Sequence, residues 1–475
     1  MKHMPCHMFV TLAALLVSSG CMKVGPDYQR PDIGIQVPGT YQHSQAGAVT
    51  PQPEDRWWQV FNDPELNRLV EEVLKNNLDI KKATAGILEV RSKFLQASAD
   101  RFPSLSLQGQ GQRQSKTVSA TPGAQREETN TYNLSLPASF ELDLWGRLAR
   151  AEEAAQADLL QAEDNRCIVA QTVVAETISL YLQMETLERR IQTAEQSIEN
   201  YRRSLAMVEH RYERGLSPVL DLKQARQALD RAEAAMPSLR QDLGIIQQKL
   251  AVLLGRYPKT SPPRHHQEDY FKDLVPVPPG LPSEILLRRP DIRAAEAKLR
   301  SLNALVGVAK AGRFPSITLT GSFGYSSEDL DRLFLPQSEL WNLSLGIVQP
   351  LFDAGKLKSR QHAAEARYQQ GVAEYAKIVL TAFYEVESAL LTRKEQLERR
   401  ERVLSFLTEA RAAEEIAENR YKRGLVDYLT VLETRQARFQ AEENLVLADL
   451  AVLSNRVTLH RVLGGGWAEL KGHLP

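Results

Sequence analysis

The residue types that carry out most enzymatic chemistry are scattered through this sequence without forming a recognisable constellation. It contains no glycine-rich phosphate loop and no paired-histidine zinc motif, so neither nucleotide hydrolysis nor metalloprotease chemistry is indicated. The segment GSFG at 321–324 falls in a predicted strand and does not match the nucleophile elbow of serine hydrolases. His265 and His266, with Glu268 and Asp269 nearby, offer metal-binding atoms, but an ordinary proline-rich loop explains them without a metal. We therefore expect no enzyme activity, no cofactor and no metal.

The composition argues against several further classes of protein. The 475 residues include 59 basic and 59 acidic side chains, and this balance argues against a nucleic-acid binder, which carries a basic face. The three cysteines, at 6, 21 and 167, cannot form a disulfide framework, and we expect Cys167 to be a small buried residue. Past residue 20 we find no apolar run of about 18 residues, so any crossing of a membrane would use strands.

The first twenty residues have the features of an export signal. A basic start at Lys2 is followed by an apolar stretch at 9–17 and by three small residues directly before Cys21. A cysteine in that place is typical of bacterial lipoproteins, in which it becomes the acylated N-terminus and anchors the protein in a membrane. An ordinary signal peptide followed by an incidental cysteine is the alternative. Met22 is not the aspartate that retains lipoproteins in the inner membrane, and this favours the outer membrane.

The chain repeats itself after roughly 210 residues. Three blocks recur in the same order with nearly constant spacing: RFPSLSLQG at 101–109 and RFPSITLTG at 313–321, YNLSL at 132–136 and WNLSL at 341–345, and RYERGL at 211–216 and RYKRGL at 420–425. This pattern indicates an internal duplication. Each copy is far longer than a solenoid repeat, so the chain is a duplicated domain rather than an array.

Each copy follows the same internal plan. In the first copy a helix capped by Asp63 runs to about Arg101, and a strand from about Leu105 is followed by a polar stretch at 112–130 that we interpret as a loop. A second strand covers about 134–144, and a very long helix follows Gly146. Apolar residues in this helix recur every three or four positions, which is the heptad pattern of coiled-coil packing. They are Leu180, Met184, Leu187, Ile191, Ala194, Ile198, Tyr201, Leu205, Val208 and Tyr212.

Glycines end the long helices and reverse the chain. Gly215 stops the first long helix, and Ser217-Pro218 provides an N-cap and a first-turn proline for a returning helix. The second copy repeats this arrangement with Gly424 and Asp427. Because each connection is so short, the two helices of each copy must pack antiparallel. At about 1.5 Å per residue, the first long helix would be a rod of roughly 100 Å.

These patterns predict six segments and a barrel shared between chains. The segments are a signal peptide at 1–20, a lipidated extended segment at 21–62, a first repeat at 63–256, a proline-rich linker at 257–282, a second repeat at 283–464 and a tail at 465–475. Four strands in two hairpins cannot close a barrel alone, and open edges are not allowed in lipid, so several chains must contribute. Two chains would give eight strands filled by side chains, and three would give twelve strands around an aqueous lumen.

The sequence resembles the outer-membrane efflux channels of the TolC type, in their lipoprotein branch, over nearly the whole mature chain. The segments that carry the resemblance follow Cys21 in the family's order: GPDYQRP (25–31), WWQVFNDPELNRLV (57–70), FELDLWGRLARAEEA (140–154), LLRRPDIRAAEAKL (286–299), GRFPSITLTGSFG (312–324) and RYKRGLVDYLTVLETRQA (420–437). The resemblance implies an α+β membrane protein. Its long antiparallel helices would form a coiled-coil barrel in the periplasm, continued by a β-barrel of four strands from each of three chains.

The same resemblance implies partners and a role. The homotrimer would be the exit duct of a tripartite efflux or export system in the Gram-negative outer membrane, with outer-membrane lipid around it. Its protein partners would be a periplasmic adaptor and an inner-membrane pump or ABC exporter. The alternative is a structural coiled-coil lipoprotein without a pore, although such a stalk would need no strand hairpins. The sequence does not choose among drugs, metal ions, small organic molecules and polypeptides as cargo.

The hairpin tips are the sites that the resemblance makes informative. The family engages its adaptor at this end, and an exposed leucine beside a turn suits a docking contact. The expected docking residues are Arg211, Gly215, Leu216, Arg420, Gly424 and Leu425. We expect each glycine to adopt a positive φ, because the chain must reverse there. The alternative is that each glycine only caps a helix.

A gate is expected just beyond the tips, where the family closes its tunnel with apolar rings, carboxylates and polar links. Threefold symmetry would bring three copies of each residue around the axis, and three carboxylates would favour cations and raise one another's pKa. Glu433 stands where the family commonly has aspartate, and Gln436 stands where its lipoprotein branch often has arginine. An ordinary surface charge pattern is the alternative. The expected gate residues are Leu220, Asp221, Gln224, Leu429, Thr430, Glu433 and Arg435.

Overall fold

The computed structural model describes residues 23–43, 56–117, 126–263 and 288–465, which belong to two compact units. One unit contains residues 86–163 and 294–376 together with the N-terminal segment up to Gly34. The other contains Asp164–Arg293, Ile35–Ala85 and the chain from Lys377 onward. Each unit therefore draws on both copies of the repeat. The predicted signal peptide, Cys21, His265 and His266 lie outside the described residues.

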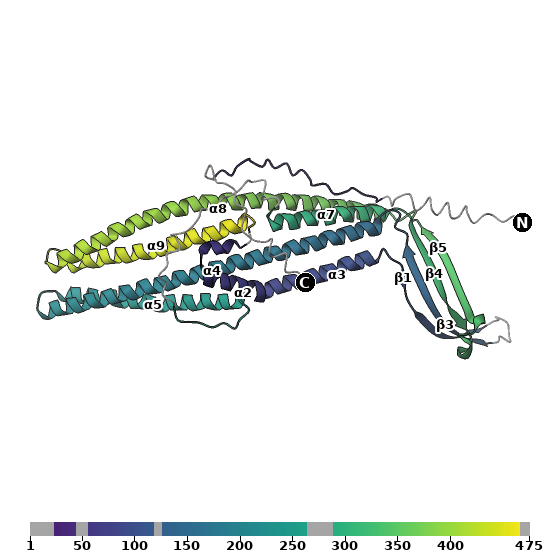
Figure 1. Ribbon diagram of the computed structural model, residues 1–475, viewed down its shortest axis with the longest axis horizontal. Coiled ribbons are helices and arrows are strands. Elements are labelled where there is room, and N and C mark those ends of the chain that lie inside the picture. The colour runs from purple at the N-terminus through teal and green to yellow at the C-terminus, as the bar shows by residue number, and fades with distance from the viewer. Residues whose placement is uncertain (1–22, 44–55, 118–125, 264–287, 466–475) are drawn as a thin grey trace. The chain divides into compact units, whose positions relative to one another are not determined.

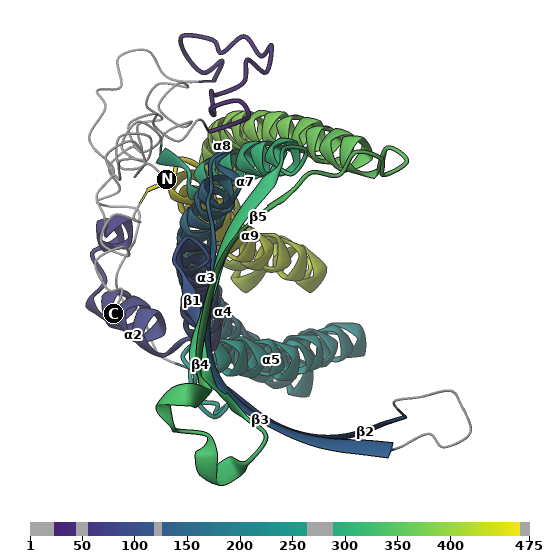
Figure 2. The same cartoon turned by 90° about the vertical axis from the view of Figure 1, so that its right-hand side faces the viewer.

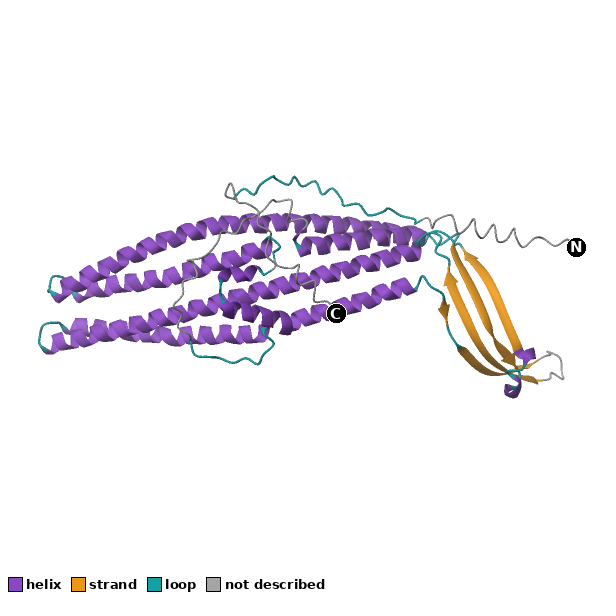
Figure 3. Cartoon of the chain, viewed as in Figure 1, coloured by secondary structure: helices purple, strands orange, loops and turns teal. Residues whose placement is uncertain are grey.

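The strands of the first unit form one antiparallel sheet (Figures 2 and 3). Its members are β1 (Ser104–Leu105), β2 (Gln108–Thr117), β3 (Arg126–Glu141), β4 (Ser316–Ser327) and β5 (Glu339–Val348). Because β1 and β2 both pair with β3, they are two pieces of one interrupted strand, and the predicted four-strand plan is confirmed. Among the described residues, β5 and the interrupted β1–β2 strand each pair on one side only.

The polar stretch between the first two strands is shorter as a loop than the sequence suggested. We expected a loop over 112–130, but β2 continues to Thr117 and β3 begins at Arg126. Cross-strand pairs explain the difference, because polar residues satisfy each other there: Lys116 lies opposite Glu127, and Arg113 forms an ion pair with Glu128. The hairpin is thus extended by residues that carry no apolar alternation.

The first predicted helix is two helices. A 3-10 turn, η1 (Trp57–Phe61), precedes α2 (Pro64–Asn76), which Asp63 caps through the backbone N–H groups of Glu65 and Leu66. The chain then breaks at Asn77, whose extended backbone ends α2. Its buried side chain accepts hydrogen bonds from the N–H groups of Asp79 and Ile80 and so caps α3 (Leu78–Ala99). A polar cap inside an apolar pattern was the missed signal.

Two pairs of long helices follow the strand pairs (Figure 1). The first pair is α4 (Arg147–Glu213), of 67 residues, and α5 (Val219–Leu253), of 35 residues. The second pair repeats these lengths in α8 (Lys356–Lys422) and α9 (Tyr428–Val462). A shorter helix, α7 (Pro290–Ala311), leads into β4, and two 3-10 turns, η2 (Leu330–Arg332) and η3 (Pro336–Ser338), join β4 to β5. Identical lengths in the two copies agree with a duplication.

The heptad seam of α4 is the core of the second unit. Most of its predicted members are buried there and pack with residues of η1, α2, α5 and α9, including Trp57, Val70, Leu243 and Val457. Tyr212 is the exception, because it lies exposed at the last turn. One window of α4 is apolar enough to span a membrane by composition, contrary to the expectation that no such run occurs past residue 20. However, 67% of that window is buried, as expected for a core helix.

Candidate functional site

Both helical hairpins reverse through the same backbone turn. In the first, the N–H of Leu216 donates to the carbonyl of Arg211 over 2.8 Å, and Gly215 donates to Tyr212 over 2.9 Å. In the second, Leu425 donates to Arg420 over 3.0 Å, and Gly424 donates to Tyr421 over 2.9 Å. This pattern is the Schellman motif, which needs a left-handed residue after the helix. The positive φ expected of the two glycines is confirmed, at 70° and 75°.

The two turns present matching side chains to solvent. Leu216 is 63% exposed and Leu425 is 68% exposed. Arg420 is exposed as well. The guanidinium of Arg211 instead lies 4.9 Å from the centre of the Tyr421 ring, so a cation–π contact joins the two tips. An exposed apolar residue flanked by basic residues therefore recurs at each tip.

The first hairpin's predicted gate residues lie on the first turns of α5. Leu220 is exposed, Gln224 is half-buried, and Asp221 accepts a hydrogen bond from the Ser217 hydroxyl over 3.0 Å. The prediction that Ser217 caps α5 is wrong, because its hydroxyl is directed to this carboxylate and the N-cap position belongs to Pro218. The Ser217 hydroxyl also lies 3.3 Å from that of Tyr421, which adds a second polar link between the tips.

The second hairpin's exposed gate residues lie on the first turns of α9. Asp427 caps this helix by accepting hydrogen bonds from the Thr430 hydroxyl (2.6 Å) and backbone N–H (2.9 Å). These hydrogen bonds hold the pKa of the Asp427 carboxyl below its usual value. Leu429 and Glu433 are exposed on the same helix. The start of α9 therefore offers both an apolar side chain and a carboxylate to solvent.

Arg435 lies elsewhere, in the interior of the second hairpin. It is only 4% exposed and bonds two carboxylates of α8: Nε donates to Glu414 over 2.9 Å, and an Nη donates to Glu418. Burial opposes the charge, but the hydrogen bond to Glu414 and the charge of Glu418 outweigh it and raise the pKa of Arg435. Its side chain is thus a polar link between α8 and α9.

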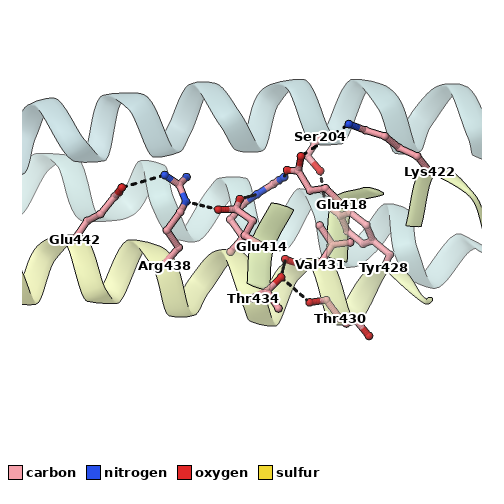
Figure 4. Close-up of polar contacts among 11 residues, drawn as sticks. Ser204, Glu414, Glu418, Lys422, Tyr428, Thr430, Val431, Thr434, Arg438 and Glu442 are labelled. Carbon is pink, nitrogen blue, oxygen red and sulfur yellow. Dashed lines mark hydrogen bonds and ion pairs between the residues drawn. The ribbon is translucent and has the colours of Figure 1, made fainter. Parts of the chain in front are cut away.

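Further residues extend this buried polar network. Arg438 pairs with Glu414 and, over 3.1 Å, with Glu442, which also accepts from Arg411 over 3.0 Å. On the facing helix, the Ser204 hydroxyl of α4 lies 2.9 Å from that of Tyr428. We call Glu414, Glu418, Arg435, Arg438 and Glu442 the Arg435 cluster (Figure 4).

A signal for this cluster is present in the sequence, although apolar periodicity alone overlooks it. Glu414 occupies a seam position of α8, between Ala410 and Ala417, at the same three-and-four spacing as the apolar members. A carboxylate at a seam position requires a buried basic partner. Arg435 and Arg438 on the returning helix are the partners that the heptad register brings opposite it.

The segment that follows Cys21 is held against the first unit. The N–H of Val24 donates to the carbonyl of Trp145 over 3.0 Å, and the buried Arg150 donates to Asp27 over 2.8 Å. Gly25 lies against Gly307 so closely that a Cβ at Gly25 would come within 2.7 Å of the Gly307 Cα. Trp145 in turn donates to the carbonyl of Pro315, directly before β4. These contacts therefore hold the N-terminal segment at the junction of the strands and the helices.

The strand register sorts the sheet into two chemically different faces. One face is apolar except at its loop end, where Arg113, Glu128 and Glu339 stand on it. Across neighbouring strands it aligns Leu136 with Phe323 and Trp341, and Phe140 with Leu319 and Leu345. The opposite face is polar, and there Ser139 aligns with Thr320 and Ser344. Such alternation is the signature of a sheet with lipid on one side and water on the other.

Aromatic residues lie at both ends of the sheet. Phe323, Tyr325 and Phe334 contact one another edge-to-face near the loop end, with ring centres 6.0 Å and 5.7 Å apart. At the helical end Trp145 stacks on Phe314 at 4.9 Å. Aromatic girdles on either side of an aliphatic band are typical of membrane interfaces.

These features define an outer-membrane channel of the efflux type, and the comparisons with known proteins agree. The family described as outer membrane efflux protein matches residues 69–256 and 281–465, so the chain belongs to that family. The matched ranges correspond to the two copies of the duplication. The predicted fold class is confirmed: helical hairpins and four strands per chain, with a barrel completed by three chains.

Individual relatives match along nearly the whole chain. The chain is 33% identical to the cation efflux system protein CusC of Escherichia coli over 98% of its own length and 100% of the relative. It is 32% identical to the solvent efflux pump outer membrane protein SrpC of Pseudomonas putida, over 96% of this chain and 97% of that protein. The outer-membrane channel OprN superposes with a TM-score of 0.87 at 29% identity, covering 94% of this chain and 99% of OprN. The protein is thus an outer-membrane efflux channel, and the pore-less stalk is not favoured.

Proposed function

We propose that three copies of this chain form one conduit and that its hairpin tips bind a periplasmic adaptor, which connects the conduit to an inner-membrane pump or ABC exporter. The observation that supports this most directly is the pair of tips with one backbone turn and one exposed leucine each. Two copies of a costly exposed contact suit a repeated docking surface. Gradients or ATP used by the pump drive transport, so the chain itself carries out no catalysis.

The docking surface comprises an apolar contact and basic flanks. Leu216 and Leu425 supply the apolar contact, while Arg420 is free to donate hydrogen bonds to carbonyl groups at a partner's helix end. Arg211 contributes through Tyr421, whose ring it covers, and so positions one tip against the other. An adaptor with an apolar pocket and an exposed helix C-terminus fits this surface.

The gate lies on the first turns of the returning helices. Leu220, Leu429 and Glu433 are exposed there, and in a threefold assembly they would form rings of leucine and of carboxylate. Asp221, Gln224 and Thr430 line the adjoining surface, and Arg435 ties the returning helix to α8. If the gate opens by movement of α9 away from α8, the Arg435 cluster is the polar link that resists opening.

Cys21 is the proposed lipid anchor, and the docked segment after it supports that placement. Lys23 and Val24 lie beside the end of the strands, so acyl chains on Cys21 would start close to the membrane boundary. Mass spectrometry of the purified protein tests this, with an acylated Cys21 at the mature N-terminus as the expected result. An unmodified terminus, or cleavage at another residue, would refute the anchor.

Cargo is not indicated by overall similarity, because the relatives named for cation efflux and for solvent efflux are equally similar to this chain, at 33% and 32% identity. We propose that the pump selects the cargo and that this chain supplies the path. Identification of the transporter encoded beside this gene would test the proposal.

The test of the conduit is its assembly and docking. The chain should purify from detergent as a trimer of about 150 kDa of protein, three times the 53.4 kDa chain less its signal peptides. A photo-crosslinking residue in place of Leu216 or Leu425 should form a covalent product with the adaptor encoded beside this gene, whereas the same residue at exposed Tyr257 should not. A stable monomer with full strand content would refute the shared barrel.

A further inference from the structure

The polar face of the sheet carries no ionisable side chain over most of its length. Its residues follow from the register of the described strands and lie on the face of Thr320 and Ser344. They are hydroxyl, amide and glycine residues, with Pro137, Leu340 and Val348 as apolar exceptions: Ser104, Gln108, Gln110, Gln112, Gln114, Thr129, Thr131, Asn133, Ser135, Ser139, Ser316, Thr318, Thr320, Ser322, Gly324, Ser326, Asn342, Ser344 and Gly346.

Charged residues on this face of the described strands stand only at its ends. Lys116 and Glu127 are cross-strand partners at the loop end, so their charges offset each other. Glu141 lies at the helical end, where Arg147 pairs with it through Nε at 3.0 Å and through Nη2 at 2.6 Å. Neither end of the face therefore carries an unbalanced charge on a strand residue.

We propose that the barrel section of the duct is neutral toward charge: its hydroxyl and amide wall passes cations, anions and uncharged polar molecules alike. Hydroxyl and amide groups both donate and accept hydrogen bonds, so they replace water around solutes of either sign. A ring of fixed charges would instead hold ions of opposite sign and exclude the others. Selection by charge is then left to the carboxylates of the helical section, Asp221 and Glu433. The inference rests on the three-chain conduit proposed above.

The test measures the local charge of the lumen with introduced cysteines in the full-length trimer, reconstituted in lipid. Thr320→Cys and Ser344→Cys place a thiol on the polar face, and Leu343→Cys places one on the apolar face. The native Cys167 is buried and gives only background reaction. Each variant is treated with a cationic and an anionic methanethiosulfonate of similar size, and each rate is divided by the rate with a small free thiol. Because the reagents enter from the outer mouth, the result does not depend on the gate.

A neutral wall predicts that the normalised cationic and anionic rates at Thr320→Cys and Ser344→Cys agree within about threefold. A matched charged wall is made by adding Ser344→Asp to Thr320→Cys, because residues 320 and 344 are cross-strand partners. The cationic rate in that double variant should exceed the anionic rate by about tenfold. A comparable ratio in the single variants would overturn the neutral wall.

The Leu343→Cys variant shows whether an unexpected result contradicts only the neutral wall or also the three-chain conduit. In a conduit surrounded by lipid, Leu343→Cys reacts with neither aqueous reagent, whatever the charge of the lumen. Equal reactivity of Leu343→Cys and Thr320→Cys in a membrane-embedded trimer would overturn the assignment of the two faces and the conduit with it. If Leu343→Cys does not assemble, Leu345→Cys on the same face replaces it.

Discussion

The two helical hairpins have the same backbone turn but differ in their interiors. Their turns use the same hydrogen bonds, and one ion pair recurs 209 positions apart, as Arg202–Glu233 at 2.7 Å and as Arg411–Glu442 at 3.0 Å. Duplication has therefore kept both the reversal of the chain and an ion pair between its helices. The proposed docking role of the two tips would require the same reversal in both copies.

The interiors differ at the next ion pair toward the turn. In the first hairpin Arg226 pairs with Glu209 over 3.0 Å on the surface, with the arginine side chain 51% exposed. The corresponding Arg435 is buried and pairs with both Glu418 and Glu414. Glu414 stands where the first hairpin has Leu205. Arg438, which pairs with Glu414, likewise stands where the first hairpin has Leu229. Two leucines of the apolar hairpin thus correspond to a charged pair in the second, where the arginine at 435 is also buried.

The two hairpins therefore hold their shape by different forces. Apolar packing tolerates small sliding, whereas a buried ion pair loses most of its energy when its atoms separate. We expect the second hairpin to have two distinct arrangements, paired and unpaired, while the first deforms gradually. Matched variants of the two hairpins can break or sharpen this contrast.

Removal of the buried arginine should have the strongest effect. Arg435→Met removes the buried guanidinium that Glu414 and Glu418 share and leaves Glu414 with Arg438 alone, so it should cost up to about 3–5 kcal/mol locally. Arg226→Met removes the exposed counterpart and should cost about 0–1 kcal/mol. Amide hydrogen exchange near the tip of α8 and α9 should accelerate by more than about 100-fold in the first variant, since 1.36 kcal/mol is tenfold. Equal effects of the two variants would show that the interiors are held by the same forces.

Distortion of the shared turn should damage both hairpins alike. Gly215→Val and Gly424→Val each force a β-branched residue to a positive φ, at a local cost of about 1–3 kcal/mol. No other atoms crowd either glycine, so the backbone alone is strained. Export should fall in both variants while trimer formation and membrane insertion continue. Gly424→Asn is the control, because asparagine tolerates this conformation. Normal export by Gly424→Val would show that the glycine only caps the helix and that the tip does not dock.

Loss of the exposed leucines should affect binding without affecting stability. Leu216→Ser and Leu425→Ser remove side chains that are largely in solvent, so the free energy of unfolding should change by less than about 0.5 kcal/mol. Crosslinking to the adaptor should weaken in each variant and disappear when both are combined. An undiminished crosslink in the double variant would contradict docking at the tips.

Acid should loosen the second hairpin first, by a small amount. The hydrogen bonds from Thr430 lower the pKa of Asp427 below its usual 3.8, so this cap stabilises α9 above that value and is lost as the pH falls through the lowered pKa. The first hairpin has Pro218 at this place and cannot titrate there. Exchange of the Thr430 amide, corrected for the intrinsic effect of pH, should accelerate in acid. Asp427→Asn should abolish that dependence, and an unchanged pH response in this variant would assign it to another group.

Much of this fold follows from periodicity, and the residues that depart from periodicity explain what did not. The heptad seam predicted α4 and its return, and the repeated RYxRGL segment predicted matching turns. Asn77 broke the first helix because its side chain caps α3, a local interaction that apolar spacing does not record. The ends of β2 and β3 were missed because polar residues near them, such as Arg113 and Glu128, pair with each other only across the hairpin.

The candidate site was predictable at its surface and less so in its interior. Exposed leucines and glycines at the tips could be predicted from the turn alone. Arg435 was expected with the exposed gate residues, yet its place inside the hairpin depends on Glu414, which lies 21 residues earlier on another helix. Charged residues near a turn have no preferred face until the register of both helices is known. The seam position of Glu414 supplies that register.

The unpaired edges of the sheet have a genetic consequence. Because β5 and the interrupted β1–β2 strand each lack a neighbour among the described residues, every chain depends on two others to complete its barrel. Damaged and intact chains in one cell would therefore enter the same rings. If half of the chains are damaged and they mix at random, only about one-eighth of the rings contain no damaged copy. An allele that alters a tip but spares the strands, such as Gly424→Val, should therefore act as a dominant allele.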